Sequence, residues 1–347
     1  MKSILIRADG SKDIGLGHLT RQIDIADELR DLNFEIYFLS KHYLEGISLI
    51  EHRNFDVIKL SPEEKTIQES IEEIEKVLVS LNRKFDIILI DLVKNFNNQQ
   101  YLNNIKNFCK KLFILSDDPA KFCVNVDAVF AISPNQEFFT YKGLETKYYT
   151  GLRYFPLHRK FQNVRKKKIK KAVSNILLTF GGSDPNNYSM KIVEILRKIN
   201  LNPQIILILG AAFPESEYEK LRQKKFKNLK IKKDVSNMIS YFRDADIAIC
   251  SAGNTLIEAL TCGVPCIVIP QTNLENERAA ALEKQNMIIN IGSGFDEFSL
   301  IDALNDMWSF SKRRKFSEKS QEKLDGKGIK RIVKILTEEN TFGTSYN

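Results

Sequence analysis

Three glycine-containing turns in this chain each follow a short apolar run and precede a helix-like pattern. Such a turn leaves backbone N–H groups free beside the positive end of a helix dipole, which favours an anion such as phosphate. Any one of them is explained equally well as a purely structural turn. The occurrence of three predicts a binding site for a phosphorylated ligand.

The candidate site residues come from these turns and from the start of each following helix. They are Gly15, Gly17, His18 and Arg21 in the first turn, Gly181, Gly182, Ser183 and Asp184 in the second, and Ser251, Gly253, Asn254, Thr255 and Glu258 in the third.

His18 is the residue we expect to carry catalysis. It lies where the first helix begins, at the top of the first predicted sheet, and free imidazole ionises near neutral pH, as a general base requires. The two glycines before it let the backbone approach a ligand. The alternative is a histidine that only caps the helix or packs in the loop.

Two further polar groups suit a nucleotide sugar. Glu258 lies one helical turn beyond Asn254 and Thr255, where a carboxylate accepts hydrogen bonds from the two ribose hydroxyls. The polar loop from Gln271 to Arg278 offers amides and carboxylates to sugar hydroxyls, although a merely solvated loop explains it as well. The acid pair Asp117-Asp118 has no metal-ligand spacing, and helix capping is its alternative role.

Composition excludes several other classes of protein. No apolar stretch approaches the roughly 20 residues that cross a bilayer, and the first residues do not form a signal peptide, so we expect a soluble, cytoplasmic chain. The five cysteines form no CxxC pair, which favours buried free thiols. The four histidines have no metal-ligand spacing, and we expect neither a metal nor a cofactor.

The net charge of +8 comes from one short stretch. Residues 159–171 contain eight basic and no acidic residues, and the other 44 basic residues match the 44 acidic ones. We interpret the stretch as a solvated linker that could touch an anionic membrane surface. Apart from Phe161 it contains no aromatic residue, so it lacks the aromatic interleaving that stacks on bases, and nucleic acid is not an expected partner.

Short apolar runs alternate with helical patterns on both sides of this linker. This alternation predicts two Rossmann-like, doubly wound domains with parallel sheets, covering residues 1–158 and 172–340. Ligands of such sheets bind beyond the carboxyl ends of the strands, so we expect the domains to face a shared cleft. The last residues, 342–347, are expected to be disordered.

These motifs resemble a known family over most of the chain. Five segments resemble the UDP-2,4-diacetamido-2,4,6-trideoxy-beta-L-altropyranose hydrolases of pseudaminic acid biosynthesis and their spore-coat polysaccharide relatives. These segments are Arg7 to Arg21, Leu115 to Asp118, Phe180 to Asp184, Ser251 to Ala259 and Asp325 to Arg331. The second half also resembles the UDP-N-acetylglucosamine domain of the transferase that completes lipid II, which has the GT-B fold.

The resemblance implies a role for individual residues. It matches His18 to the catalytic base, Glu258 to the ribose ligand, and Ser183, Asn254 and Thr255 to the diphosphate site. It also implies that Val235 presents backbone to uracil, and that Asn276 and Glu277 bind hydroxyls of the sugar. One departure is that the family's tyrosine shortly after the acid matching Asp91 is missing here.

The sequence therefore predicts metal-independent hydrolysis of a UDP-linked amino-deoxysugar, with inversion, in nonulosonic acid or surface polysaccharide biosynthesis. A GT-B glycosyltransferase with a UDP-sugar donor is the first alternative, and a nucleotide-sugar-binding protein without catalysis is the second. The expected partner is the UDP-sugar, no integral membrane segment is expected, and the sequence is compatible with a monomer.

Overall fold

The computed structural model describes most of the chain as two compact units. It covers residues 1–11, 15–92, 98–117, 124–139, 141, 145–199, 202–223 and 227–338. Met1–Gln162 and the segment from Gly326 onward form the first unit, and Asn163–Asp325 form the second.

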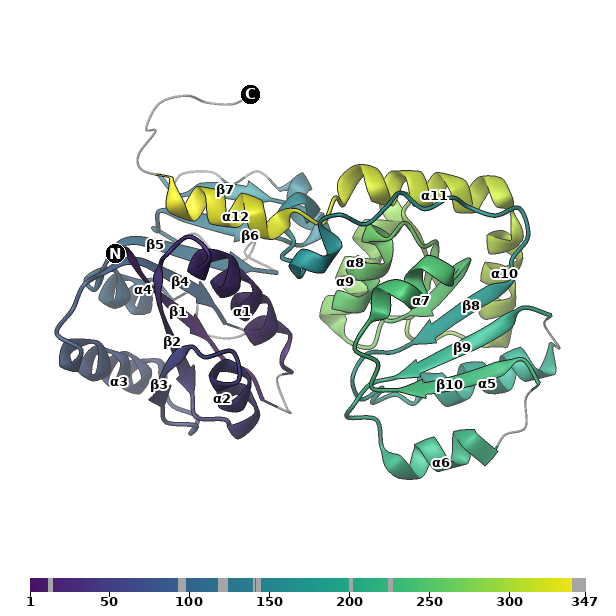
Figure 1. Cartoon of the computed structure of the whole chain (residues 1–347), viewed down its shortest axis with the longest axis horizontal. Coiled ribbons are helices and arrows are strands. Elements are labelled where there is room, and N and C mark those ends of the chain that lie inside the picture. The colour runs from purple at the N-terminus through teal and green to yellow at the C-terminus, as the bar shows by residue number, and fades with distance from the viewer. Residues whose placement is uncertain are drawn as a thin grey trace. The chain divides into compact units, whose positions relative to one another are not determined.

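The first unit is built on one parallel sheet of seven strands in the order β3-β2-β1-β4-β5-β6-β7 (Figure 1). Its strands are β1 (Ser3–Ala8), β2 (Glu35–Lys41), β3 (Asp56–Leu60), β4 (Phe85–Asp91), β5 (Cys109–Ser116), β6 (Ala128–Ala131) and β7 (Lys147–Thr150). Its α-helices are α1 (Gly17–Arg30), α2 (Leu44–Glu51), α3 (Ile67–Ser80), α4 (Gln99–Lys106) and α12 (Gly328–Thr337).

The second unit repeats this plan with six parallel strands in the order β10-β9-β8-β11-β12-β13. Its strands are β8 (Asn175–Thr179), β9 (Gln204–Leu209), β10 (Leu229–Lys233), β11 (Ile247–Cys250), β12 (Cys266–Val268) and β13 (Ile288–Asn290). Its helices are α5 (Tyr188–Lys198), α6 (Glu215–Gln223), α7 (Met238–Asp244), α8 (Asn254–Thr261), α9 (Asn273–Lys284), α10 (Glu297–Trp308) and α11 (Phe310–Lys323).

The central strands are apolar on both faces because helices cover both sides of each sheet. All six residues of β1 are buried, and Ile4 of that strand pairs in parallel with Ile36 of β2 and Ile87 of β4. In the second unit β11 is likewise fully buried between β8 and β12. Continuous apolar runs of this kind are typical of parallel sheets. The predicted pair of doubly wound parallel sheets is confirmed.

The last helix does not belong where the sequence placed it. The second domain was expected to continue to residue 340, but α12 packs against α1 of the first unit. Its buried face is Ile329, Ile332, Val333 and Leu336. At Gly326 and Gly328 a Cβ atom would overlap the backbone carbonyls of Phe161 and Phe155, so the returning chain fits only with glycine.

The basic stretch is also more ordered than a solvated linker. Residues from Asn163 onward belong to the second unit, and the carbonyl oxygens of Lys170 and Lys171 accept hydrogen bonds from Arg313 of α11, at 2.9 and 2.7 Å. The side chain of Lys167 donates to the carbonyls of Phe242 and Arg243. Backbone contacts of this kind could not be predicted from charge alone.

The four cysteines that the structure describes, Cys109, Cys250, Cys262 and Cys266, are buried free thiols, as expected. Burial raises the pKa of both Cys109 and Cys262 to about 12. Among the described residues no helix combines the length and apolar character needed to cross a membrane. Asp118, Cys123 and residues 342–347 lie outside the described residues.

Candidate active site

The first glycine turn leads into α1 at the carboxyl end of β1. Gly15 has a φ of 78°, a conformation that glycine adopts easily, and a Cβ atom there would meet no other atom within 4 Å. Helix α1 begins at Gly17, so His18 lies in its first turn, as predicted. The His18 side chain is 22% exposed, so the ring is accessible to a small reactant.

The His18 ring contacts a buried carboxylate. Its Nδ1 atom lies 2.7 Å from Oδ1 of Asp91, the last residue of β4 and completely buried. Arg21 approaches the same carboxylate with Nε at 2.6 Å from Oδ2 and Nη2 at 2.5 Å from Oδ1. Gln22 donates to Oδ2 at 2.9 Å. One carboxylate thus holds three side chains from the first two turns of α1.

Electrostatics fixes the proton on this imidazole. Burial alone would raise the pKa of Asp91, but Arg21 and His18 outweigh it and lower the pKa below its usual range. The carboxylate is therefore ionised and can only accept. Nη2 of Arg21 also lies 3.0 Å from Nδ1 of His18, but the shorter contact of 2.7 Å with the carboxylate favours the tautomer of neutral His18 that carries the hydrogen on Nδ1. The lone pair is then on Nε2, the atom that a general base uses.

Arg21 has a different place from the one expected. It was predicted among the substrate ligands, but it is only 4% exposed and its Nη1 atom donates to Asp117 at 2.8 Å. With Asp91 and Asp117 both bound, its guanidinium ties the carboxyl ends of β4 and β5 to α1. The guanidinium thus holds the carboxylates of Asp91 and Asp117 in place, and the role of Arg21 as a substrate ligand stays a prediction.

The second glycine turn follows β8 in the other unit. Gly181 has a φ of 76°, and neither Gly181 nor Gly182 has an atom within 4 Å of a built Cβ, so the backbone is open to a ligand. Gly210, after β9, lies so close that a Cβ atom there would overlap Gly182. Ser183 is exposed at the end of the turn.

The helix after this turn already holds a carboxylate. Oδ1 and Oδ2 of Asp184, which is 5% exposed, accept hydrogen bonds from the backbone N–H groups of Tyr188 and Ser189 at 3.0 and 2.8 Å. Asp184 therefore neutralises the start of α5, which begins at Tyr188, later than Pro185 suggested. Two N–H groups at the start of α5 are therefore already bound, and anion binding at this junction stays a prediction for the Gly181–Gly182 turn.

The third turn differs from the second in this respect. Helix α8 begins after Gly253, and no side chain caps it. Asn254 is exposed, and Thr255 and Glu258 are half-buried one and four residues further on. Ser251 is buried directly after β11. The start of α8 is thus a helix N-terminus of this edge without a side-chain cap, the kind of helix end that attracts an anion.

Two residues that the sequence analysis named only as part of the polar loop from Gln271 to Arg278 tie these turns together. Glu275 of α9 accepts hydrogen bonds through Oε2 from the N–H groups of Ala252 and Gln271, at 3.3 and 2.8 Å. The Gln271 side chain donates to the carbonyl of Phe180 at 3.2 Å. The loops after β8, β11 and β12 therefore form one connected edge, with a carboxylate beside the start of α8.

The remaining predicted ligands lie at the same carboxyl edge of the second sheet. Val235 is half-buried just after β10, following Asp234 with its φ of 51°. Asn276 and Glu277 lie in the first two turns of α9, half-buried and exposed respectively. The parallel strands bring all of these residues to one edge, and the interdomain cleft stays a prediction.

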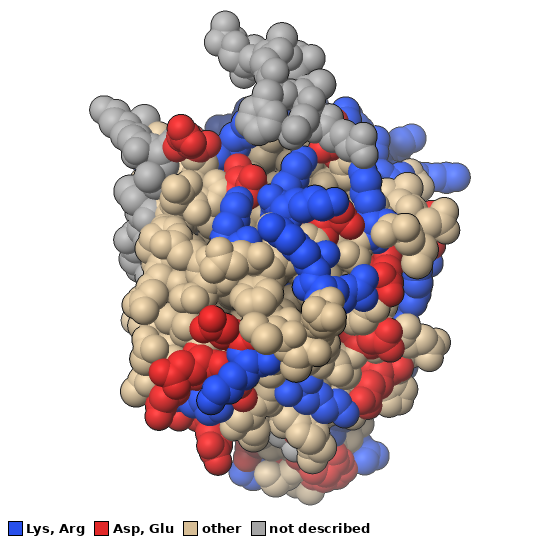
Figure 2. Space-filling view, turned by 90° about the vertical axis from the view of Figure 1, so that its left-hand side faces the viewer, with Lys and Arg blue, Asp and Glu red and all other residues tan. Residues whose placement is uncertain are grey.

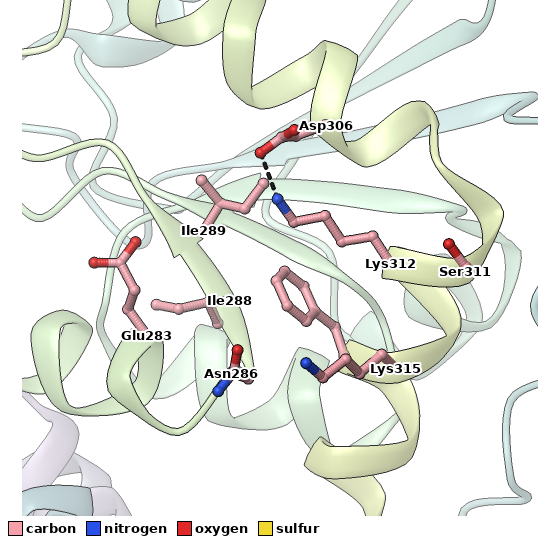
Figure 3. Close-up of a pocket in the computed structure, with 9 residues that line it drawn as sticks. Glu283, Asn286, Ile288, Ile289, Asp306, Ser311, Lys312 and Lys315 are labelled. Atoms are coloured by element: carbon pink, nitrogen blue, oxygen red, sulfur yellow. Dashed lines mark hydrogen bonds and ion pairs between the residues drawn. The ribbon is translucent and has the colours of Figure 1, made fainter.

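A surface pocket of the second unit lies elsewhere. Figure 3 shows it between the edge strand β13, the end of α9 and α11, with the ion pair of Lys312 and Asp306 across it. It contains no residue of the three glycine turns. The part of the chain that the structure describes holds no group of three side chains that could bind a metal ion.

The two doubly wound parallel sheets have the GT-B fold. The solved structure of MurG from Acinetobacter baumannii is similar with a TM-score of 0.72 over 97% of this chain and 99% of that one, at 14% sequence identity. Residues 176–334 match the glycosyltransferase family 28 C-terminal domain.

Relatives place the chain within a family. It is 31% identical over 342 residues to the uncharacterized protein MJ1062 of Methanocaldococcus jannaschii, covering 89% of this chain and 67% of the relative. The chain belongs to the family of that protein.

Two more distant relatives carry functional names. The spore coat polysaccharide biosynthesis protein SpsG of Bacillus subtilis is 26% identical, over 95% of this chain and 96% of its own length. The UDP-2,4-diacetamido-2,4,6-trideoxy-beta-L-altropyranose hydrolase of Campylobacter jejuni is 25% identical, over 74% and 87%. The resemblance stated from the motifs is confirmed at this distance.

Proposed function

We propose that this protein hydrolyses a UDP-linked amino-deoxysugar to UDP and the free sugar, in nonulosonic acid or surface polysaccharide biosynthesis. The observation that carries the proposal is the His18–Asp91 pair, whose geometry leaves Nε2 of the imidazole as a base. The similarity to a UDP-sugar hydrolase supports this reaction, and the similarity to SpsG supports a place in polysaccharide biosynthesis.

In the proposed reaction, Nε2 of His18 removes a proton from water while the water oxygen attacks the anomeric carbon. The bond from that carbon to the diphosphate oxygen breaks, and UDP leaves from the opposite side, which inverts the configuration. Asp91 stabilises the imidazolium that forms. General-base assistance of this kind contributes roughly 10²–10⁴ in rate.

The leaving diphosphate is assigned to the open start of α8 and to the Gly181–Gly182 turn. Free backbone N–H groups and the helix dipole offset its charge without a metal ion. Asn254 and Thr255 lie at this helix start, and we assign Glu258, four residues after Asn254, to the ribose hydroxyls. The remaining predicted ligands, Val235, Asn276 and Glu277, are assigned to uracil and the sugar.

A transferase with the same donor site is the second candidate, because the C-terminal domain model is that of glycosyltransferase family 28. His18 would then deprotonate an acceptor hydroxyl in place of water. Purified protein incubated with UDP-sugars separates the two. Release of UDP without any acceptor supports hydrolysis, strict dependence on an acceptor supports transfer, and binding without turnover leaves a nucleotide-sugar-binding protein.

A further inference from the structure

Two basic segments of the second unit run side by side. Residues 163–171 lie along helix α11, as Figure 1 shows, and Arg313 of that helix binds the carbonyl oxygens of Lys170 and Lys171. Further along, Lys166 and Lys168 line a surface hollow with Arg314. We call residues 163–171 together with α11 the basic ridge.

The basic ridge holds the whole charge excess of the protein. Residues 163–171 contain six basic and no acidic residues, and α11 contains six basic and two acidic ones. Their combined charge of +10 exceeds the +8 of the complete chain. The rest of the chain is therefore slightly acidic, and the face drawn in Figure 2 shows acidic side chains among its basic ones.

Much of this charge is exposed and unneutralised. The side chains of Arg165, Lys166, Lys168, Lys171 and Lys315 are exposed and have no hydrogen-bond or ion-pair partner among the described residues. Other members are paired only at the surface, for example Arg314 with Glu318 at 3.0 Å. Such exposed pairs are weak and do not prevent an external anion from binding.

An aromatic side chain borders the ridge. Trp308, the only tryptophan of the chain, ends α10 directly before the Ser309 cap of α11, and it is 41% exposed. Tryptophan is favoured at the boundary between lipid headgroups and hydrocarbon. Nine of the twelve basic residues are lysines, which bind a diffuse negative surface as point charges, whereas base edges and phosphates are read by arginine forks.

We propose that the basic ridge docks this protein on an anionic lipid bilayer, with Trp308 at the headgroup level. The interaction needs no membrane-spanning helix, because each lysine near such a surface contributes about 1 kcal/mol, or roughly fivefold in binding. The proposal is independent of the reaction that the protein catalyses.

The test is flotation of the purified full chain with vesicles. Phosphatidylcholine vesicles containing about a third phosphatidylglycerol should bind it at 100 mM salt, and pure phosphatidylcholine vesicles should not. Binding should weaken as salt screens the charges. The emission of Trp308 should shift to shorter wavelength on the anionic vesicles only.

A triple variant locates the surface. Lys166→Gln, Lys168→Gln and Lys171→Gln together should lower the vesicle partition coefficient about 100-fold, from the fivefold step per lysine. The matched control replaces Lys227, Lys230 and Lys232, exposed near or on β10, with glutamine and removes the same charge. Its partitioning should stay within about threefold of wild type.

Three results overturn the proposal. The first is the absence of binding to anionic vesicles, and the second is an equal loss of vesicle binding in both triple variants. The third is tight binding of duplex DNA at a salt concentration at which the protein does not bind the vesicles. The first two show that the ridge is an ordinary solvated surface, and the third assigns it to nucleic acid. Circular dichroism melting of each variant verifies that the fold is kept.

Discussion

At the scale of single residues, the proposed chemistry depends on the carboxylate of Asp91, whose contact with His18 could not be predicted from sequence spacing. The position of His18 could be predicted because glycines and a helix start surround it. Asp91 is the last residue of an apolar run, and its register with α1 decides that it meets His18, Arg21 and Gln22. Sequence spacing alone holds no information about that contact.

Replacing Asp91 with asparagine tests its role directly. The amide no longer fixes the proton on Nδ1 of His18 or stabilises the imidazolium, so turnover should fall by about 10²–10⁴. The dissociation constant for UDP, which we assign to the other unit, should be unchanged. Single-turnover rates and calorimetric UDP binding measure the two effects.

Asp86→Asn is the matched control for this variant, since Asp86 lies near the other end of β4 and bonds Ser3 and Lys110. It should leave turnover as it is. If Asp91→Asn and Asp86→Asn lose activity equally, the carboxylate of Asp91 has no special part in the reaction.

Glu275 gives a second prediction at this scale. Its carboxylate lies at the start of α8, where we place the diphosphate. The negative charges of Glu275 and of a diphosphate bound there would repel each other by about 1 kcal/mol at an intermediate dielectric constant. Glu275→Gln keeps a hydrogen-bond acceptor and removes the charge, so UDP should bind about fivefold more tightly while neutral uridine binds as before.

The control for this effect is Glu283→Gln, near the other end of α9. Titration calorimetry with uridine, UMP and UDP should show a gain that grows with phosphate charge only for Glu275→Gln. Weaker UDP binding in that variant would mean that Glu275 supports the ligand instead of repelling it. If none of the three ligands binds either protein, the site assignment itself is wrong.

At the scale of elements, two junctions that look alike in sequence behave differently. Both are strand, glycine turn and helix, yet Asp184 caps α5 and no side chain caps α8. An acidic residue that caps a helix and one that binds a ligand have the same sequence pattern after a glycine turn. The distinction needs the left-handed backbone at Asp184, with its φ of 46°, which turns the carboxylate back onto the helix.

Helix α1 carries a buried acid whose ionisation opposes folding. Burial, with a smaller contribution from Asp27, raises the pKa of Asp24 to about 6, although Arg53 lowers it. An unfolded aspartate titrates near pH 4, so the folded protein holds an extra proton between about pH 4 and 6. The free energy of unfolding therefore falls as the pH rises through this window and stays low above it.

Asp24→Asn removes this opposition. The variant should gain stability over wild type, and the gain should be about 1 kcal/mol larger at pH 8 than at pH 5. Urea unfolding at the two pH values measures it. Asp31→Asn, the exposed residue that ends α1, is the control and should show no pH-dependent gain. A gain independent of pH would show that Asp24 is not protonated near pH 6.

At the scale of the whole molecule, alternation of strands and helices was enough to predict two doubly wound sheets. It was not enough to assign α12, because an amphipathic helix shows that it has a buried face but not which unit covers it. Edge strands β7 and β13 were missed for a related reason. They are short, and residues of both are only half-buried, so their apolar signal is weak.

The distribution of charge, like the position of α12, could be predicted from the sequence only in part. Counting residues located the basic stretch, but its position beside α11 adds a second run of lysines and arginines that the linear sequence places about 150 residues away. The isolated linker predicted from the sequence is one half of a larger surface. That surface, and not the linker alone, is the feature to test with membranes.

The central claim is that an imidazole on the first unit acts on a sugar whose nucleotide the second unit holds. The most direct measurement is the rate of UDP release from a UDP-amino-sugar, without acceptor, by wild type and His18→Ala at saturating substrate. We predict release by wild type and a loss of about 10²–10⁴ in the variant, with UDP affinity unchanged. Equal rates in the two proteins would contradict the account.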